Sequence, residues 1–128
     1  GEDTDIDVFN LRDFDFSSAK ICVFCSTEEI SKHDIPRALA KGSFVIDSSG
    51  AYTTDSDVPL IIPEINAEKV SDARKGIVAL PSPLVLQTLI PLQKIAGKIN
   101  ITRLMINAYI LNLSFVIIWP IIILGFRN

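Results

Sequence analysis

The chain has 128 residues, enough for one modest domain with its own core. Its net charge of -3, with no basic stripe among its aromatic residues, argues against a nucleic-acid surface. Two cysteines do not make a disulfide framework, and the acidic start does not read as a secretory signal, so the simplest expectation is a cytoplasmic origin for residues 1–100.

The first predicted elements are a strand, a helix and a second strand. Lys20–Phe24 is a short β-branched run, typical of a strand buried on both faces. A helix is predicted over residues 31–41, with Ser31 as its N-cap and Pro36 in its first turn. Phe44–Asp47 is the second strand. Because the connections are short, this order favours a parallel βαβ unit in an α/β fold.

Two more strands and a second helix follow. Gly76–Leu80 reads as a third buried strand, and Ile101–Ala108 as a fourth. Between them, Leu84–Gly97 has helical spacing of its apolar residues, although Pro91 must kink or shorten that helix.

The C-terminal tail differs from the rest of the chain. Leu104–Phe126 has no charged residue, and Arg103 and Arg127 flank it. Such a length can cross a bilayer as a helix. Its richness in Ile and Val is equally typical of strands in a sheet, and a membrane span is the less favoured interpretation.

Polar residues follow the first two predicted strands. Ser26 and Thr27 come after the first strand, and Ser48 and Ser49 come after the second. The carboxyl ends of parallel strands share one edge of a sheet, where α/β folds bind ligands. A plain turn after Phe44–Asp47 is the alternative, and the sequence leaves both open.

The other candidate residues favour structural roles. Cys22 and Cys25 have redox spacing, but residues three apart in a strand point to opposite faces, so two buried small residues are predicted. His33, the only histidine, is predicted to be solvated. No set of four metal ligands is present, so no metal site is expected.

Three stretches of sequence carry a family resemblance. They are FVIDSSGAY (44–52), DVPLIIPEIN (57–66) and GIVALPSPLVLQTLIPL (76–92). Together they resemble the aspartate-semialdehyde dehydrogenase family, and the Ile-Asp-Ser-Ser-Gly variant makes the chain similar to the Usg-type paralogues. The resemblance implies a partial Rossmann-like, dinucleotide-binding α/β domain, a parallel sheet with flanking helices, over residues 1–100. Residues 101–128 would then begin a dimerisation domain and run into the apolar tail.

In that family, NADPH reduces aspartyl phosphate in amino-acid biosynthesis through a cysteine thiolate. The resemblance places the nucleophilic cysteine at Pro83, an anion-binding arginine at Thr53 and a catalytic glutamine at Ile110. The family's Gly-rich phosphate turn has no counterpart in the chain. Ser82 is the hydroxyl nearest the lost nucleophile and is predicted to cap the following helix. No catalytic residue and no dehydrogenase activity are therefore expected.

Of the family's nucleotide cleft, the resemblance implies that only the far wall remains in this chain. The candidate cofactor-binding residues on that wall are Ser26, Thr27, Ser48 and Ser49. Glu28 and Glu29 replace small residues there, and two carboxylates would repel a phosphate. No cofactor is therefore expected on this chain alone, although the family uses NADP. The alternatives are a non-catalytic binding module that forms a homodimer through residues 101–108, and a membrane-tethered remnant. The tail also fits an altered reading frame or a truncated gene.

Overall fold

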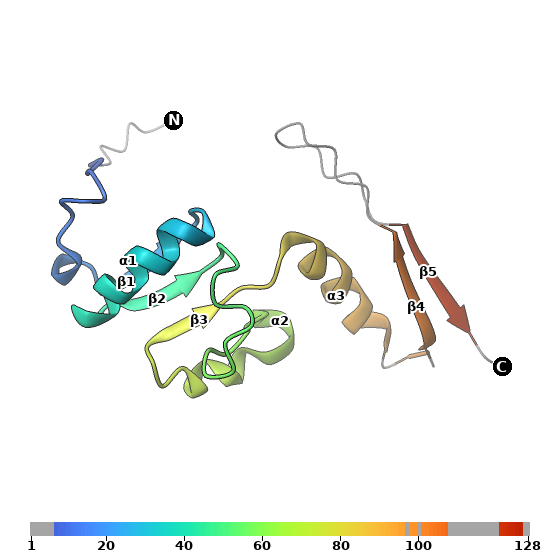
Figure 1. Ribbon diagram of the computed structural model, residues 1–128. Coiled ribbons are helices and arrows are strands. Elements are labelled where there is room, and N and C mark those ends of the chain that lie inside the picture. The colour runs from blue at the N-terminus through green and yellow to red at the C-terminus, as the bar shows by residue number, and fades with distance from the viewer. Residues whose placement is uncertain (1–6, 97, 100, 108–120, 127–128) are drawn as a thin grey trace, which may run out of the picture.

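The computed structural model describes residues 7–96, 98–99, 101–107 and 121–126 (Figure 1). Its helices and strands follow in the order β1 (Ile21–Phe24), α1 (Glu28–Ala40), β2 (Phe44–Asp47), α2 (Pro63–Asn66), β3 (Ile77–Ala79), α3 (Pro83–Ala96), β4 (Ile101–Asn107) and β5 (Ile121–Phe126). Two 3₁₀ turns, η1 (Phe16–Ser18) and η2 (Ala67–Asp72), complete the described elements.

The three predicted strands form one parallel sheet in the order β1-β2-β3. Its register places Ile21 beside Phe44, and Val45 beside Ile77. This sheet with its flanking helices confirms the Rossmann-like α/β fold. A parallel bridge from Leu60 to Ala79 covers the outer edge of β3.

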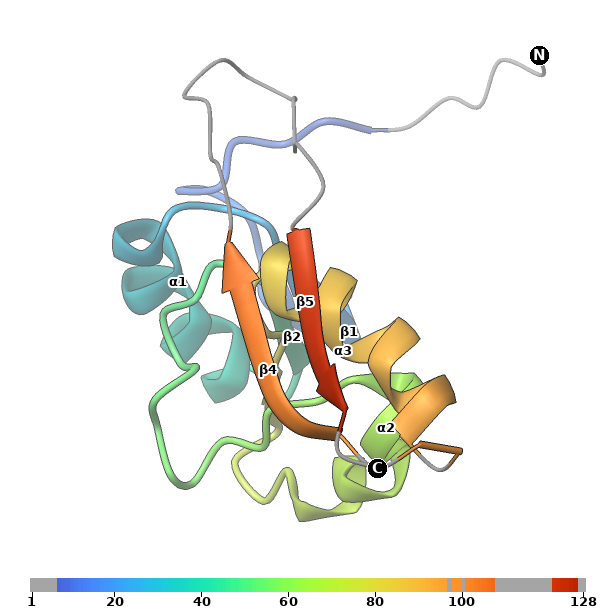
Figure 2. The same ribbon diagram turned by 90° about the vertical axis from the view of Figure 1, so that its right-hand side faces the viewer.

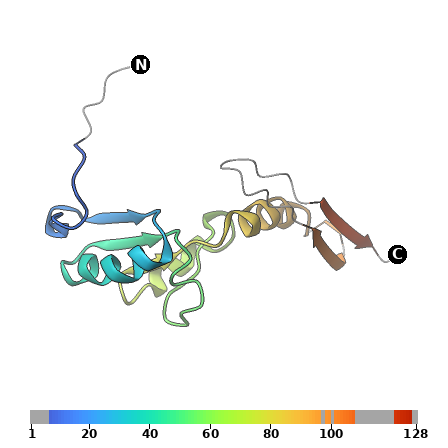
Figure 3. The same cartoon turned by 45° about the horizontal axis from the view of Figure 1, so that its top comes forward.

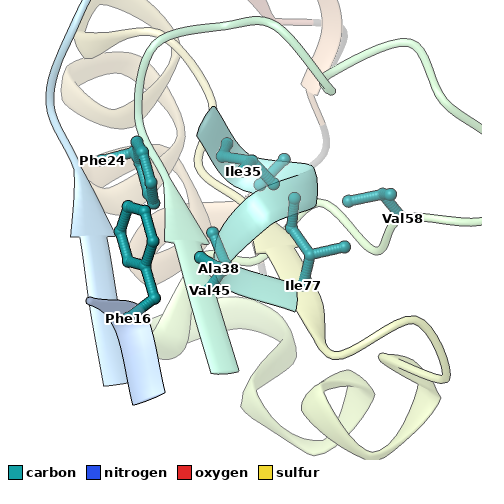
Figure 4. Packing of buried hydrophobic residues seen from close by; sticks show 8 residues of the cluster. Phe16, Phe24, Ile35, Ala38, Val45, Val58 and Ile77 are labelled. Atoms are coloured by element: carbon teal, nitrogen blue, oxygen red, sulfur yellow. The ribbon is translucent and has the colours of Figure 1, made fainter. Parts of the chain in front are cut away.

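The core lies between the sheet and α1. Successive side chains of a strand point to opposite faces, so Val45 and Ile77 face the helix together. There they meet Ile35 and Ala38 of α1, and none of these four side chains is more than 1% exposed (Figure 4). Burial of each large aliphatic side chain in this layer contributes about 1.5–3 kcal/mol.

The sequence predicted that the first strand is buried on both faces, and this prediction is wrong. Ile21 is 63% exposed and Val23 is 61% exposed, whereas Phe24 is buried against Phe16. The reason is position, because β1 is the outermost strand of the described sheet. A short β-branched run gives no indication of which strand of a sheet lies at the edge.

The first helix begins one turn earlier than predicted. Thr27 is its N-cap, and the Thr27 hydroxyl accepts a hydrogen bond from the Ile30 amide at 3.5 Å. Ser31 lies inside the helix and is fully buried. Pro36 therefore lies well past the first turn, where it offers no N–H to the carbonyl of Lys32.

The described residues that follow the parallel sheet form α3 and an antiparallel ribbon of β4 and β5. Pro91 lies inside α3 without ending it. Figure 2 shows the two strands of the ribbon side by side, and Figures 1 and 3 show the ribbon beyond α3, away from the parallel sheet. The prediction of a strand at Ile101–Ala108 is confirmed over the described residues.

The segment for which a membrane span was the less favoured interpretation, Leu104–Phe126, falls partly outside the described residues, at 108–120. Its described ends, 104–107 and 121–126, are paired strands and not a helix. Among the residues that were placed, no helix is both long and apolar enough to cross a bilayer.

Candidate functional site

The carboxyl ends of the three parallel strands meet at one edge. Phe24, Asp47 and Ala79 are direct neighbours across the sheet. The Ser48 amide donates to the Phe24 carbonyl at 2.9 Å, and the Leu80 amide donates to the Asp47 carbonyl at 2.7 Å. The structure therefore brings the polar residues that follow β1 and β2 to the same edge.

Ser48 fastens the end of β2 to the end of β1. Its hydroxyl donates to the Phe24 carbonyl at 3.1 Å, beside the bond from its own amide. The single hydroxyl proton is used in this bond. What the Ser48 oxygen still offers to a ligand is its acceptor capacity.

Asp47 and Ser49 build the turn that follows β2. Asp47 is fully buried, and its Oδ1 accepts from the Ser49 amide at 3.0 Å and from the Ser49 hydroxyl at 2.7 Å. The Ser49 oxygen in turn accepts from the Ala51 amide at 3.1 Å. Gly50 completes the turn with a φ of 92°, which an L side chain rarely adopts. Asp47 Oδ2 has no hydrogen-bond partner among the described residues.

Sequence reasoning treated Asp47 as a strand end and missed its role. The signal was present, because Asp followed two residues later by Ser is typical of a side chain that bonds the backbone of a turn. The aromatic ring of Tyr52 lies close by. Burial raises the pKa of the Tyr52 phenol, and the carboxylates of Asp47 and Asp55 raise it further.

Ser26 and Thr27 are both engaged in the start of α1. The Ser26 hydroxyl lies 2.8 Å from the hydroxyl of the buried Ser31, and it also donates to the Thr27 carbonyl at 3.3 Å. Thr27 is the N-cap of the helix. These two hydroxyls have structural partners that the sequence did not reveal.

The N-terminus of α1 carries negative charge at this edge. Glu28 and Glu29 lie in the first turn of the helix, where carboxylates are favourable to the helix dipole. Glu28 pairs with Lys32 at 3.3 Å, and a Cβ on Gly50 would lie 3.6 Å from Glu28 Oε1. The helix end that could attract a phosphate thus holds carboxylates of its own, as the sequence indicated.

The turn after β3 offers no activated nucleophile. Pro83 is the first residue of α3, and the Ser82 carbonyl accepts from the Leu86 amide at 3.1 Å, so Ser82 directly precedes the helix. Its hydroxyl accepts no hydrogen bond from a described helix amide, so the predicted side-chain cap is not formed. The exposed Ser82 hydroxyl has no side-chain hydrogen-bond partner among the described residues.

The remaining candidates lie elsewhere. Cys22 is half-buried, but Cys25 is exposed, so the prediction of two buried cysteines is wrong for Cys25, which lies one residue past the end of β1. The His33 side chain is 76% exposed, as predicted, and its Nδ1 lies 3.1 Å from Asp34. Within the described part of the chain, no three metal-ligating side chains come together.

Comparison with known proteins decides the family. Residues 1–73 match the family model described as semialdehyde dehydrogenase, NAD binding domain. The chain belongs to the aspartate-semialdehyde dehydrogenase family. Over 105 residues it is 34% identical to the aspartate-semialdehyde dehydrogenase of Shewanella violacea and 33% identical to that of Rickettsia conorii. These matches cover 81% of this chain but only 31% of each relative. This family member thus spans about a third of the length of the curated relatives that it matches.

Solved structures of the family share the fold. Aspartate semialdehyde dehydrogenase II from Vibrio cholerae, complexed with ASA, has a TM-score of 0.73 and 32% identity, over 79% of this chain and 30% of that one. A probable aspartate-semialdehyde dehydrogenase from Pseudomonas aeruginosa has a TM-score of 0.69 and 28% identity, over 77% of this chain and 30% of that one. The Rossmann-like sheet of this chain therefore has the same fold as the matching part of these solved family members.

Proposed function

We propose that this chain is a non-catalytic, Usg-like member of the aspartate-semialdehyde dehydrogenase family. The observation that carries the proposal is the turn between β3 and α3, where Pro83 stands at the position that the resemblance gives to the nucleophilic cysteine. A covalent acyl intermediate needs a thiol, hydroxyl, amine or carboxylate at that position. Proline supplies none of these groups, and its ring nitrogen is part of the peptide bond.

The neighbouring groups do not replace the missing thiol. The hydroxyl of Ser82 needs an adjacent base to become a nucleophile. Among the described residues no side chain makes a hydrogen bond to it. Cys25 lies after β1, in a groove that is lined mainly by apolar residues such as Leu11, Phe14 and Val23. None of the residues that line this groove is a base that could activate the Cys25 thiol.

The proposal assigns Ser26, Thr27, Ser48 and Ser49 to the far wall of the family's nucleotide cleft. All four lie at the carboxyl edge of β1 and β2. We further propose that the chain alone does not hold NADP. The hydroxyls of these residues already bond to Ser31, Ile30, Phe24 and Asp47, and the charges of Glu28 and Glu29 oppose a pyrophosphate. A cytoplasmic location, fitting the two free cysteines, belongs to the same proposal.

An activity assay tests the proposal. The chain is incubated with aspartate semialdehyde, phosphate and NADP, and the absorbance of NADPH is followed, with the Shewanella violacea enzyme as the positive control. No NADPH is expected from this chain. Cofactor reduction by this chain would overturn the proposal, and the double variant Cys22→Ser/Cys25→Ser would show whether that reduction depends on a cysteine.

A second candidate function is assembly through the β4 ribbon. Leu104, Met105 and Ile106 are 37%, 47% and 43% exposed, so three successive apolar residues of β4 face solvent. This surface favours a homodimer at the place where the resemblance implies one. Met105→Lys is expected to weaken any such dimer, so that the average mass in light scattering falls toward that of the monomer. A wild-type chain that is strictly monomeric would exclude this function.

A further inference from the structure

A pocket of about 670 Å³ lies beside β3, at the edge of the sheet that the bridge from Leu60 to Ala79 covers. All its lining residues fall within the segment 56–75, which joins β2 to β3 through α2 and η2 (Figure 1). None of the four hydroxyl residues of the proposed nucleotide wall contributes to it. Its volume is typical of pockets that bind small molecules.

One wall of the pocket is apolar and held by hydrogen bonds. Pro59 and Leu60 form this wall, and the Pro59 carbonyl accepts from the Ala79 amide at 3.0 Å. The side chain of Asn66 closes the same loop, because its Nδ2 donates to the Leu60 carbonyl at 2.9 Å and its Oδ1 accepts from the Ile62 amide at 2.7 Å. A wall that is already ordered lowers the entropic cost of binding.

The charged residues of the pocket fall into two groups. Lys75 and Asp57 satisfy each other, with Nζ 2.9 Å from the carboxylate, and Lys75 also lies 3.5 Å from Asp55, which does not line the pocket. The hydrogen bond to Asp57 raises the pKa of Lys75. The other group, Lys69, Asp72 and Arg74, makes no ion pair with any described residue.

The backbone brings this second group together. Lys69 and Asp72 are three residues apart in η2, and a 3₁₀ helix has three residues per turn, so both lie on the same face. They do not pair with each other even so. Arg74 follows directly, with its amide donating to the Asp72 carbonyl at 2.7 Å. The pocket therefore holds two cationic groups and one anionic group whose charges are not satisfied by the described chain.

We propose that this pocket binds a free acidic α-amino acid, a small molecule that carries one ammonium and two carboxylate groups. The Arg74 guanidinium matches a carboxylate with two parallel hydrogen bonds, and Lys69 offers a point charge to the second carboxylate. Asp72 accepts from the ammonium group. The ligand's net charge of minus one then complements the net charge of plus one of these three side chains.

Asp72 distinguishes this ligand from a simple anion. Inorganic phosphate or a plain dicarboxylate would meet Lys69 and Arg74 favourably, but it would leave the Asp72 carboxylate beside a like charge. An amino acid without an acidic side chain would satisfy Asp72 and only one of the two cations. The charge pattern therefore favours the acidic amino acid over both.

Nuclear magnetic resonance of the whole ¹⁵N-labelled chain tests the proposal. Titration with L-aspartate is expected to shift amide resonances within residues 56–75 in a saturable way. Succinate lacks the ammonium group and L-alanine lacks the second carboxylate, so each should bind about tenfold more weakly or worse. A shift that does not saturate, or one that succinate reproduces at equal concentration, would overturn the proposal.

Variants assign the binding to the three side chains. Arg74→Gln should weaken L-aspartate binding by about tenfold or more, and Asp72→Asn should remove the preference for L-aspartate over succinate. Lys41→Gln is the matched control, because it removes one exposed positive charge at the end of α1, outside the pocket. The spectra themselves show that each variant is folded. Binding that Arg74→Gln leaves unchanged, or that Lys41→Gln weakens equally, would contradict the site.

The result is independent of the catalytic proposal. The titration contains neither NADP nor aspartate semialdehyde, and none of the three side chains lies in the turn that carries Pro83. An inactive chain can therefore bind the amino acid or fail to bind it, and each outcome is read separately from the activity assay.

Discussion

Asp47 Oδ1 accepts two hydrogen bonds from Ser49, one from its amide at 3.0 Å and one from its hydroxyl at 2.7 Å. The carboxylate is fully buried, and its other oxygen has no partner among the described residues. One side chain at the end of β2 therefore determines the conformation of the Ser-Ser-Gly turn. Both the proposed nucleotide wall and the stability of the fold therefore depend on Asp47.

Asp47→Ala is expected to lower the free energy of unfolding by about 2–3 kcal/mol. The change leaves the Ser49 amide and hydroxyl without their charged acceptor. Asp47→Asn should cost less than half as much, because its amide oxygen can still accept both bonds and its amide nitrogen replaces the unpartnered oxygen. Urea unfolding measures both variants. Equal losses for Ala and Asn would show that the acceptor at Oδ1 is not what stabilises the turn.

Thr27→Ala is expected to destabilise the chain by about 1 kcal/mol, the usual cost of removing an N-cap side chain. Thr27→Asp should retain the cap, since a carboxylate oxygen can accept from the Ile30 amide at the same helix end. Thermal unfolding of the two variants decides the matter. A helix that began at Ser31 would be insensitive to both substitutions.

Ile35→Ala and Ile21→Ala are expected to differ sharply, although both remove the same atoms. Ile35 is fully buried between α1 and the sheet, so its truncation should cost about 2–5 kcal/mol. Ile21 is 63% exposed, so its truncation should change stability by no more than about 0.5 kcal/mol. Urea unfolding at a low protein concentration measures both without the effect of association. A large loss from Ile21→Ala would contradict the exposed edge of β1.

The ion pairs of Lys75 predict a dependence of stability on pH. The Asp57 amide and Lys75 lower the pKa of Asp55 below its ordinary value of 3.8, and the carboxylate of Asp57 raises the pKa of Lys75 above its ordinary value of 10.5. A lowered carboxyl pKa contributes stability above 3.8 that is lost as the pH falls through the folded-state value. A raised ammonium pKa contributes stability below 10.5 that is lost as the pH rises through the folded-state value.

Asp55→Asn should therefore flatten the acid side of the stability profile and leave its neutral slope unchanged. Lys75→Met should flatten the alkaline side. The midpoint of urea unfolding, followed across both pH ranges, measures each effect. Wild-type slopes retained in both variants would mean that these exposed ion pairs contribute nothing measurable, as is common at surfaces.

Local patterns in the sequence were sufficient to predict the strands of the sheet, but not to predict which strand lies at its edge. The β-branched runs before Cys25 and Ser48 predicted β1 and β2, because each run ends at polar residues that break a strand. Burial of β1 could not be predicted, since it depends on which strands lie beside it. The start of α1 was missed because Thr27 and Ser31 are both good N-caps, and only the carboxylates of Glu28 and Glu29 in the first turn favour Thr27.

The candidate site was predicted in its location more fully than in its bonding. Strand ends in a parallel sheet share an edge, so Ser26 and Ser48 were expected to follow neighbouring strands at one edge, as they do. The partners of their hydroxyls come from residues distant in the chain or from the next helix turn, and periodicity carries no such information. Whether these hydroxyls contact a nucleotide stays a prediction.

Intact-mass spectrometry after incubation with aspartate semialdehyde and NADP tests the central claim most directly. With Pro83 in place of a thiol, the protein is predicted to keep its mass, and a thiol-reactive probe should label Cys25 equally before and after incubation. A stable acyl adduct that maps to Ser82, Cys22 or Cys25, formed together with NADPH, would contradict the account.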